Sequence, residues 1–273
     1  MPPGEKEMRR RQVPAVTRAI GILRQLGKAD EPLGVNQIAR NMDLIPSTCL
    51  HILRVLVEES LVSFDPVSKR YAIDVGILPI ARTAIQKNTF ISLVEERLTG
   101  LSLRLGVTAI ATQLSNRDDM VVVALSQAPL PFRLQVDLGS RFPALISATG
   151  RCLAAFTDIP ESELKKHFSA LKWDQPPTYQ QWKSEIAETK ARGFAVDRSN
   201  YISGVTVIAV PFLDQADGMT HSLVAIGISE KIEAAGVSVV AEEMMRIRDG
   251  VAALLVGGHA KAPGAAARPK KPK

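Results

Sequence analysis

Residues 14–73 carry a series of amphipathic helices that ends in a β-hairpin, and this order constrains the fold more than any other feature of the sequence. Between residues 14 and 26, apolar side chains recur at steps of three and four positions, and Pro14 suits the first turn of a helix. A second, shorter helix is expected over residues 35–42, and Pro46 opens a third. The periodicity therefore predicts three packed helices near the N-terminus.

A tight turn and a hairpin complete this pattern. Residues 43–45 separate the second helix from the third, and residues 61–64 and 70–73 are short β-type runs around turn-forming residues. Two helices that meet at an angle across a short turn, followed by a hairpin, form a winged helix-turn-helix. We therefore expect such a domain, mostly helical with one β-hairpin, over residues 13–75.

The third helix has one apolar and one polar stripe. Short polar residues at its N-terminal end, followed by a long donor such as Arg54, suit a helix that enters the major groove of DNA. Basic residues at the hairpin tip can neutralise phosphates beside that groove. The candidate DNA-contacting residues are Arg18, Gln37, Ser47, Thr48, His51, Arg54, Lys69 and Arg70. A solvated helix face shows the same residue types, so the stripe alone leaves both interpretations open, but the complete order of elements favours double-stranded operator DNA.

Net charge adds little to that argument because of where the charge lies. The formal charge is +6, of which residues 259–273 contribute +5, so the rest of the chain sums to +1. Charge alone is therefore weak evidence for nucleic acid binding. Residues 257–273 are rich in Ala, Gly, Pro and Lys, and we expect a disordered basic tail there.

Residues 76–87 are expected to form a helix that links the first domain to the rest of the chain. Its apolar residues are Ile77, Ile80, Ala81, Ala84 and Ile85. An exposed linker does not need so much hydrophobic surface, so packing against a partner chain is the expected reason for it. We therefore expect a linker over residues 76–90 and at least a dimer.

Beyond residue 90 the pattern changes to mixed α and β. Two hairpins are predicted, with strands over residues 107–114, 120–125, 205–213 and 222–228. Helices are predicted over residues 93–105, 149–156, 161–171 and 178–192, followed by a final helix whose apolar face extends from Val237 to Leu254. The helix over residues 178–192 opens with a Thr-x-x-Gln capping box. We expect an α+β domain with an antiparallel sheet over residues 91–256.

Several classes of site find no support in the sequence. Cys49 and Cys152 cannot form a disulfide framework or a four-ligand zinc site, and the histidines are scattered, so we expect no metal and no cofactor. We find no phosphate-binding glycine loop and no nucleophile elbow, so no catalytic residues are assigned. No apolar run has the length of a membrane helix and no secretory signal is evident, so we expect a cytoplasmic location and no membrane contact.

Two sets of motifs resemble the IclR family of bacterial transcriptional regulators, and together they span residues 13 to about 256. The first set is Ala15-Val16-Thr17-Arg18-Ala19-Ile20-Gly21-Ile22-Leu23, Ile38-Ala39, Pro46-Ser47-Thr48 and Tyr71. The second set is Pro143, Ser147-Ala148-Thr149-Gly150-Arg151, Gly193-Phe194-Ala195-Val196-Asp197, Gly204-Val205, Ile208-Ala209 and Pro211. Each motif is weak alone, but two independent sets in the expected order make the resemblance specific.

The resemblance implies a winged-helix DNA-binding domain, a linker helix and a GAF-like effector domain that binds a small organic acid. It also implies homodimers formed through the N-terminal region, often paired into homotetramers through the effector domains. The effector pocket of the family falls on Ala148, Thr149, Asp197, Val205, Val207, Gly227 and Ser229. The backbone amides of Ala148 and Thr149 lie near an expected helix start, which suits a carboxylate.

Two of these pocket positions depart from the pattern of the family. Members that bind very small keto acids carry cysteine where Val207 stands and serine where Gly227 stands. Loss of both polar groups enlarges the apolar part of the pocket, so a larger acid, such as an aromatic one, fits better than glyoxylate or pyruvate. Asp197 has an alternative role, because an aspartate before Ser199 and Asn200 can cap a turn instead of binding a ligand.

These observations favour a ligand-responsive, DNA-binding transcriptional regulator, either a repressor or an activator, that controls a catabolic operon. The alternative is an enzyme, such as a small-molecule hydrolase with an appended DNA-binding module, and the missing nucleophile and base count against it. A third interpretation is an interaction module that relies on the basic tail. That interpretation predicts that removal of residues 259–273 abolishes all DNA affinity.

Overall fold

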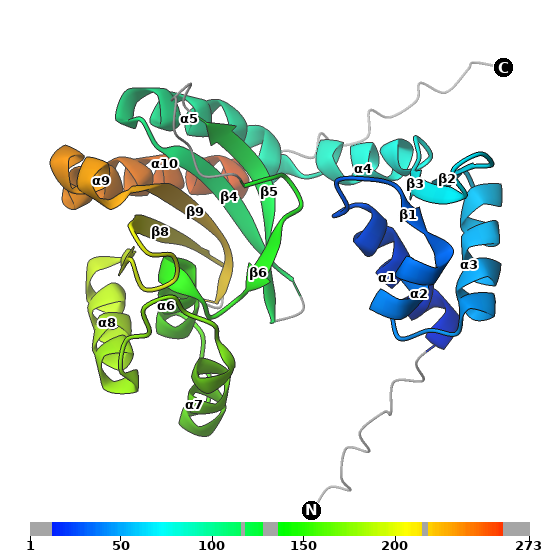
Figure 1. Cartoon of the computed structure of the whole chain (residues 1–273). Coiled ribbons are helices and arrows are strands. Elements are labelled where there is room, and N and C mark those ends of the chain that lie inside the picture. The colour runs from blue at the N-terminus through cyan, green and yellow to red at the C-terminus, as the bar shows by residue number, and fades with distance from the viewer. Residues whose placement is uncertain (1–12, 116–117, 128–135, 215–217, 259–273) are drawn as a thin grey trace, which may run out of the picture. The chain divides into compact units, whose positions relative to one another are not determined.

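The computed structural model describes residues 13–115, 118–127, 136–214 and 218–258. These residues form two compact units that divide between Lys87 and Asn88 (Figure 1), and each unit has a hydrophobic core of its own. The basic tail predicted over residues 257–273 lies outside the described residues from position 259 onward. No helix within the described ranges is both long enough and apolar enough to span a membrane.

The N-terminal unit is a helical domain with a small sheet. Its helices are α1 (Pro14–Leu26), α2 (Val35–Asn41), α3 (Pro46–Glu58) and α4 (Ile77–Gln86), and its strands are β1 (Leu33–Gly34), β2 (Val62–Asp65) and β3 (Arg70–Ile73). The strands form an antiparallel sheet in the order β1-β3-β2. The predicted winged helix-turn-helix is therefore confirmed, with β1 as a short addition that the sequence did not predict.

One face of each of the first three helices is buried in the core of this unit. In α3 the buried residues Cys49, Leu53 and Leu56 follow the three- and four-residue spacing of a helix. They belong to the same cluster as Ile22 of α1 and Ile38 of α2, which are fully buried. This packing turns the opposite face of α3 toward solvent.

Helix α4 differs from the other three because none of its residues is buried. Leu78 and Ile80 are each 63% exposed. The helix begins at Ile77, and Pro79 lies in its first turn, where a missing backbone N–H costs nothing. Its apolar surface therefore remains uncovered by the N-terminal unit.

The C-terminal unit is built on a six-stranded antiparallel sheet in the order β6-β5-β4-β9-β8-β7. Its strands are β4 (Thr108–Ser115), β5 (Asp119–Gln127), β6 (Arg141–Pro143), β7 (Ala195–Arg198), β8 (Val205–Leu213) and β9 (Met219–Ile228). Its helices are α5 (Thr89–Leu105), α6 (Ser147–Ala155), α7 (Glu161–Ala170), α8 (Tyr179–Arg192), α9 (Ser229–Ala235) and α10 (Val237–Gly258). The predicted α+β domain with an antiparallel sheet is confirmed.

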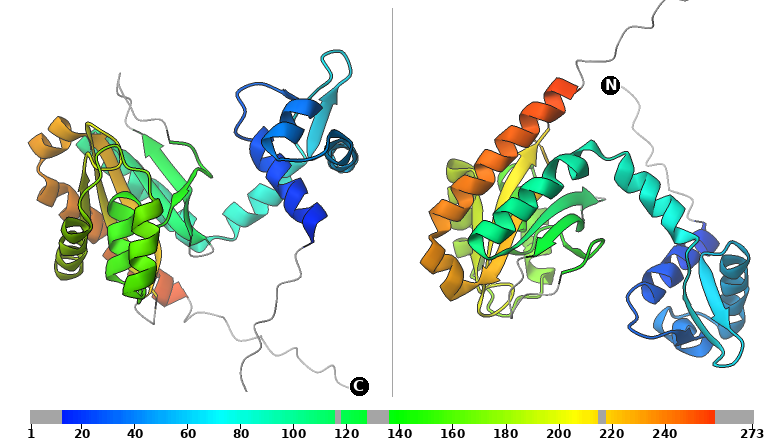
Figure 2. Two further views of the ribbon diagram at one scale, coloured as in Figure 1. Left: turned by 60° about the horizontal axis from the view of Figure 1, so that its bottom comes forward. Right: turned by 90° about the horizontal axis from the view of Figure 1, so that it is seen from above.

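Helices cover both faces of this sheet (Figure 2). α5 and α10 lie side by side against one face, and with α9 they form a core with alternate residues of β4, β8 and β9. α6 packs against the other face, together with α7 and α8, and forms a second core with the intervening strand residues. The strands therefore bury both of their faces.

The N-termini of three helices show which residues determine where each helix begins. Thr178 and Gln181 form the predicted capping box at the start of α8. α5 begins at Thr89, earlier than predicted, because the side chain of Asn88 accepts a hydrogen bond from the amide of Ile91. α6 begins at Ser147 and not at Thr149, the residue predicted to open it.

Candidate functional site

The exposed face of α3 carries the residues expected to contact DNA. Ser47, His51 and Arg54 are exposed, Thr48 is half-buried, and the opposite face of the helix is packed in the core. Pro46 occupies the first helical position, so the short polar residues follow directly at the N-terminal end of the helix. This arrangement leaves the polar stripe of α3 free to enter a groove of DNA.

The tip of the hairpin is a turn stabilised by Asp65. Its carboxylate accepts hydrogen bonds from the amides of Val67 (2.9 Å) and Ser68 (3.3 Å). The hydroxyl of Ser68 also donates to it, and these bonds lower the pKa of Asp65. Lys69 has a left-handed backbone with φ of 59° at this tip, and its ammonium lies 5.9 Å from the ring of Phe64.

Arg70 is held differently from its neighbour Lys69. Its guanidinium donates a hydrogen bond to the carbonyl of Pro32 (3.0 Å) and lies 3.7 Å from a carboxylate oxygen of Glu31. The side chain therefore faces the connection between α1 and β1 instead of extending from the hairpin tip. Gln37 lines the same surface concavity as Arg70, whereas Arg18 is exposed on α1.

The C-terminal unit contains a cavity of about 230 Å³ beside the sheet face that α6 covers. Most of its lining is apolar and comes from strands β4, β8 and β9 and from the segments beside β6 and β7. The lining residues are Ile110, Val136, Ser140, Arg141, Phe142, Ser147, Thr149, Tyr201, Ile202, Val207, Val224 and Ile226. Polar groups enter the cavity chiefly from the N-terminus of α6 and from residues 140–141.

Ser147 is the unusual residue of this lining. It has a left-handed backbone with φ of 57°, a conformation that a residue with a Cβ adopts at a cost of the order of 1–3 kcal/mol. Its hydroxyl is buried and has no hydrogen-bond partner. The first backbone bond of α6 runs from the amide of Gly150 to the carbonyl of Ile146, so the amides of Ser147, Ala148 and Thr149 lack helical acceptors.

Arg141 brings a positive charge to the wall of the cavity. Its guanidinium donates two hydrogen bonds to one carboxylate oxygen of Asp119, at 3.2 and 2.8 Å. Asp119 lies opposite Pro143 in the adjacent strand pair, so the ion pair joins β5 to β6. The cavity wall therefore includes a guanidinium whose charge is paired with Asp119.

The seven residues expected in the effector pocket do not all lie in this cavity. Thr149 and Val207 line it, and Ala148 and Val205 belong to the adjoining core. Ser229 begins α9, where its hydroxyl accepts a hydrogen bond from Thr206 (2.9 Å). The cavity therefore brings together Thr149 and Val207, while Ser229, Asp197 and Gly227 are placed elsewhere.

Gly227 lies on the opposite face of the sheet from Val207. In the pairing of β8 with β9, Val207 stands opposite Ile226, and Gly227 stands opposite Thr206. A Cβ at Gly227 would lie 3.0 Å from a side-chain carbon of Ile232 in α9. Because side chains alternate between the two faces of a strand, Ile226 and not Gly227 borders the cavity beside Val207.

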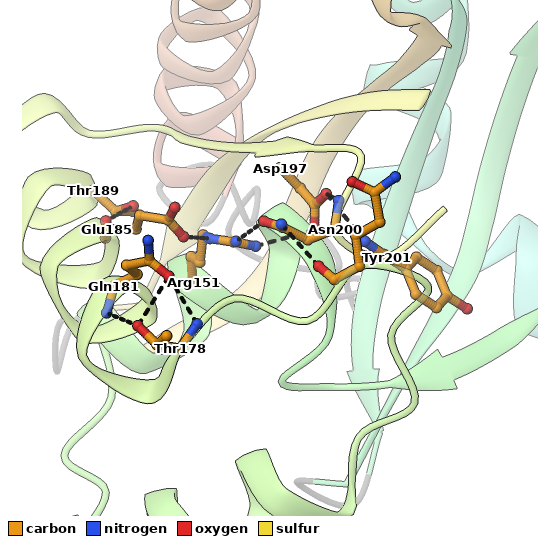
Figure 3. Close-up of polar contacts among 9 residues, drawn as sticks. Arg151, Thr178, Gln181, Glu185, Thr189, Asp197, Asn200 and Tyr201 are labelled. Atoms are coloured by element: carbon orange, nitrogen blue, oxygen red, sulfur yellow. Dashed lines mark hydrogen bonds and ion pairs between the residues drawn. The ribbon is translucent and has the colours of Figure 1, made fainter. Parts of the chain in front are cut away.

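Asp197 is fully buried in a polar cluster centred on Arg151 (Figure 3). One oxygen of Asp197 accepts from Nη1 of Arg151 (3.1 Å), and the other accepts from the amides of Asn200 (2.9 Å) and Tyr201 (3.3 Å). The alternative in which Asp197 caps a turn is thus confirmed for Asn200, although Ser199 takes no part in these bonds.

Six cavity residues carried no signal that pointed to them in the sequence. Ile110, Val224 and Ile226 are ordinary strand residues. Arg141 and Phe142 belong to β6, which is too short to show a period, and Tyr201 lies in the loop after β7. Ser147 stood within a motif that resembled a family, yet its backbone conformation and its unpartnered hydroxyl appear only in three dimensions.

The cysteines do not form a reactive site. Both are buried free thiols, and burial raises the pKa of Cys152 to about 12 and raises that of Cys49 as well. A thiol with such a pKa is a poor nucleophile near neutral pH. Within the described ranges, no group of three or more His, Cys, Asp or Glu side chains is arranged to hold a metal ion.

Comparison with known families agrees with both units. A model of the C-terminal domain of the bacterial transcriptional regulator IclR matches residues 82–248, and a model of the IclR helix-turn-helix domain matches residues 15–66. The chain belongs to the IclR family of transcriptional regulators. It is therefore a ligand-responsive DNA-binding protein with a helix-turn-helix domain and an effector-binding domain, and its family is one of regulators and not of enzymes.

Curated relatives of this IclR-type regulator match along most of their length. The chain is 25% identical over 233 residues to the glycerol operon regulatory protein of Streptomyces coelicolor, and the match covers 82% of this chain and 87% of that protein. The chain is 24% identical over 236 residues to the transcriptional repressor AllR of Escherichia coli, and the match covers 84% of this chain and 86% of AllR.

Solved structures of IclR-type proteins share the fold. An IclR-type transcriptional regulator from Alicyclobacillus acidocaldarius matches with a TM-score of 0.80 and 24% identity, over 89% of this chain and 98% of that one. An IclR homologue from Microbacterium hydrocarbonoxydans, solved in complex with 4-hydroxybenzoate, matches with a TM-score of 0.71 and 13% identity, over 87% of this chain and 97% of that one.

Proposed function

We propose that this regulator controls a catabolic operon in response to a small organic acid with an apolar body, which binds in the cavity beside α6. The observation that carries the proposal is the composition of this cavity. Its walls are largely apolar. At one end lie the buried, unpartnered hydroxyl of Ser147 and the first amides of α6, which lack helical acceptors. That combination suits a ligand with a carboxylate at one end and a hydrophobic body behind it.

The carboxylate would bind at the N-terminus of α6. The partial positive charge of a helix N-terminus favours an anion, and free amides at that end can donate hydrogen bonds to it. The hydroxyl of Ser147 can add a donor, because it is buried and has no partner of its own. Thr149 lines the same end and is almost completely buried.

The body of the acid would lie against the sheet. Val207, Val224 and Ile226 line this part of the cavity, and none has a side chain that can hydrogen-bond. A volume of about 230 Å³ lies below the range typical of pockets for drug-sized ligands, which begins near 300 Å³. A compact acid with an aliphatic or aromatic body therefore fits the chemistry better than a very small, wholly polar one.

Control of an operon would follow from a shift between conformations. A ligand moves such an equilibrium only if it binds one conformation better than the other. In the proposed dimer, effector binding would favour one separation of the two recognition helices, and this separation would set the fit to two operator half-sites. The name of one curated relative, the glycerol operon regulatory protein, supports the proposal that this chain controls an operon.

A thermal-shift screen of organic acids tests the proposal. A ligand at a hundred times its dissociation constant stabilises the folded protein by about 2.7 kcal/mol. The panel would contain benzoate, 4-hydroxybenzoate and short aliphatic acids beside glyoxylate and pyruvate. We expect acids with an apolar body to stabilise the protein more than glyoxylate and pyruvate do.

Two variants connect that response to the cavity. Val207→Asp places an uncompensated charge in the apolar wall and should abolish the response. Ile208→Val is the matched control, because Ile208 is the next residue of β8 and belongs to the core on the other face of the sheet. A folded Val207→Asp protein that responds as the wild type does would place the effector elsewhere.

A further inference from the structure

Arg151 of α6 is a fully buried arginine whose guanidinium contacts three other elements of the C-terminal unit. Nε donates to Glu185 of α8 (2.6 Å), Nη1 to Asp197 of β7 (3.1 Å) and Nη2 to the side-chain oxygen of Asn200 (2.8 Å). Trp173 lies against the guanidinium, with 5.8 Å between the central carbon and the ring centroid. Every nitrogen of the group therefore has a partner, as Figure 3 shows.

Asn200 belongs to the loop between β7 and β8, and that loop supplies part of the cavity wall. Tyr201 and Ile202 line the cavity. In Figure 3 the side chain of Tyr201 points away from Arg151, so the arginine contacts the base of the loop and not its cavity side. The loop contains no regular structure between residues 199 and 204, and its shape depends on its hydrogen bonds.

Several of those hydrogen bonds converge on Asp197 and Asn200. Asp197 accepts the backbone amides of Asn200 and Tyr201 with the oxygen that does not face Arg151. Asn200 also donates its side-chain amide to the carbonyl of Gln175 (3.0 Å), and the amide of Gln175 donates to the carbonyl of Asn200 (3.0 Å). The part of the loop around Asn200 is therefore fixed through groups that Arg151 itself holds, whereas Tyr201 and Ser203 also form backbone hydrogen bonds with Asp174.

The other end of this connection is the helix that begins at Ser147. Arg151 lies one turn after Ser147 on α6, and Ser147 and Thr149 also line the cavity. A planar guanidinium with five donors can join several acceptors in fixed directions, which an ammonium cannot do. Arg151 thus links the helix that forms one wall of the cavity to the loop that forms another.

We propose that Arg151 is a positioning residue for the effector site, which sets the distance between the N-terminus of α6 and the Tyr201–Ile202 wall through Asp197 and Asn200. This inference rests on the proposed function, because it assumes that the cavity is where the effector binds. Arg151 does not touch the effector. Its loss should lower affinity for the acid because the wall then samples conformations that do not bind it.

Hydrogen exchange in the ligand-free protein tests the first half of the proposal. Replacement of Arg151 leaves the buried carboxylate of Asp197 without its partner and can prevent folding, so Asn200 is the better position for a variant. Asn200→Ala removes the acceptor of Arg151 Nη2, and we expect the amides of residues 200–202 to exchange about tenfold faster. Asn200→Asp keeps that acceptor but loses the donor to the carbonyl of Gln175, so it should restore part of the protection. Val240→Ala, in the core on the other face of the sheet, controls for general destabilisation.

Calorimetric titration with 4-hydroxybenzoate tests the second half. We expect Asn200→Ala to weaken its binding by about tenfold, Asn200→Asp by less, and Val240→Ala not at all. Unchanged exchange of residues 200–202 in Asn200→Ala would overturn the proposal whether or not the acid binds. Faster exchange with unchanged affinity would overturn it too.

The two proposals fail in different ways. The assignment of the effector site and its ligand fails if Val207→Asp binds 4-hydroxybenzoate as the wild type does, or if the wild type does not bind it. In either case the exchange measurement alone still decides whether Arg151 and Asn200 hold the loop. If Val207→Asp loses binding while Asn200→Ala keeps both protection and affinity, the site stands and the positioning role of Arg151 is wrong.

Discussion

Among single residues, the basic side chains of the N-terminal unit differ in what their charged groups contact. Arg54 is exposed on the polar face of α3, and a long donor there can reach base edges in the major groove. Arg54→Ala should therefore weaken binding to a specific operator by roughly 1–3 kcal/mol while leaving binding to random duplex nearly unchanged. Fluorescence anisotropy with both duplexes measures this difference. Equal losses on the two duplexes would exclude Arg54 from base contacts.

Lys69 and Arg70 provide a matched pair at the wing. Lys69 lies at the hairpin tip, whereas the guanidinium of Arg70 is bonded to the carbonyl of Pro32. Lys69→Ala should remove one phosphate contact and reduce the slope of log affinity against log salt by about 0.9. Arg70→Ala should change the slope less, because its charge is directed toward Glu31. A salt titration in which both variants keep the wild-type slope would show that the wing does not contact phosphate.

His221 makes the stability of the C-terminal unit depend on pH. Its ring packs 4.2 Å from the ring of Phe90 between centroids, and burial lowers its pKa from 6.5 to about 4. Between these values the unfolded chain binds a proton that the folded chain does not, so stability falls as pH decreases. The loss between pH 7 and 5 should be about 2 kcal/mol.

His221→Phe isolates that contribution. The variant cannot bind the proton and keeps an aromatic ring beside Phe90, so its stability should change less between pH 7 and 5. Urea unfolding at several pH values gives both curves. Parallel curves for the wild type and the variant would mean that His221 titrates alike in the folded and unfolded chain.

At the scale of elements, two helical glycines have opposite roles. A Cβ at Gly150 of α6 would lie 2.0 Å from the backbone of Leu145, whereas a Cβ at Gly250 of α10 meets nothing within 4 Å. Gly150→Ala should displace α6. Overpacking of a core typically costs about 1–3 kcal/mol, and we expect this variant to lose about 2–3 kcal/mol of the free energy of unfolding. Gly250→Ala should stabilise it by up to about 1 kcal/mol through helix propensity. Chemical denaturation of the two variants shows whether each substitution raises or lowers the free energy of unfolding. Equal denaturation midpoints for the two variants would contradict the packing of α6.

Sequence periodicity predicted the long elements because each has a repeated apolar spacing and a clear end signal. α1 and α3 open with Pro14 and Pro46, and α8 opens with a capping box. The strands that it missed, β1, β6 and β7, have two, three and four residues. Such strands are too short to show an alternation on their own. β2 and β3 also have four residues each, but turn-forming residues lie between them and predicted a hairpin there.

For a related reason, the sequence did not show on which face of the sheet Gly227 lies. β8 and β9 have buried residues on both faces, and each contains a run of consecutive apolar residues, 207–210 and 223–226. Such runs do not reveal which residues point toward α6. A shift by one residue along a strand moves a side chain to the other face. Pairing with β8 resolves the ambiguity, because Ile226 and not Gly227 stands opposite Val207. Resemblance to a family therefore identified the strand, and three-dimensional pairing identified the face.

For the whole molecule, we expect the uncovered apolar residues of the N-terminal unit to mediate self-association. Val13 and Val16 at the start of α1 are 60% and 54% exposed, and Leu78 and Ile80 of α4 are each 63% exposed. Clustered exposed apolar residues of this kind are typical of interaction surfaces. Regulators with a helix-turn-helix commonly bind two half-sites as dimers, because dimer symmetry matches the symmetry of the operator. We therefore expect at least a dimer in solution.

Substitutions in α4 test that expectation. Because Leu78 and Ile80 are exposed in the chain itself, Leu78→Glu with Ile80→Glu should leave the fold of each unit intact but place charges in the proposed dimer surface. We expect sedimentation at micromolar concentration to shift from dimer or tetramer toward monomer, and affinity for a two-half-site operator to fall much more than affinity for a single half-site. Gln86→Glu, at an exposed polar position of the same helix, should change neither quantity. A wild-type protein that sediments as a monomer and keeps full operator affinity would rule out α4 as the surface that pairs the DNA-binding units.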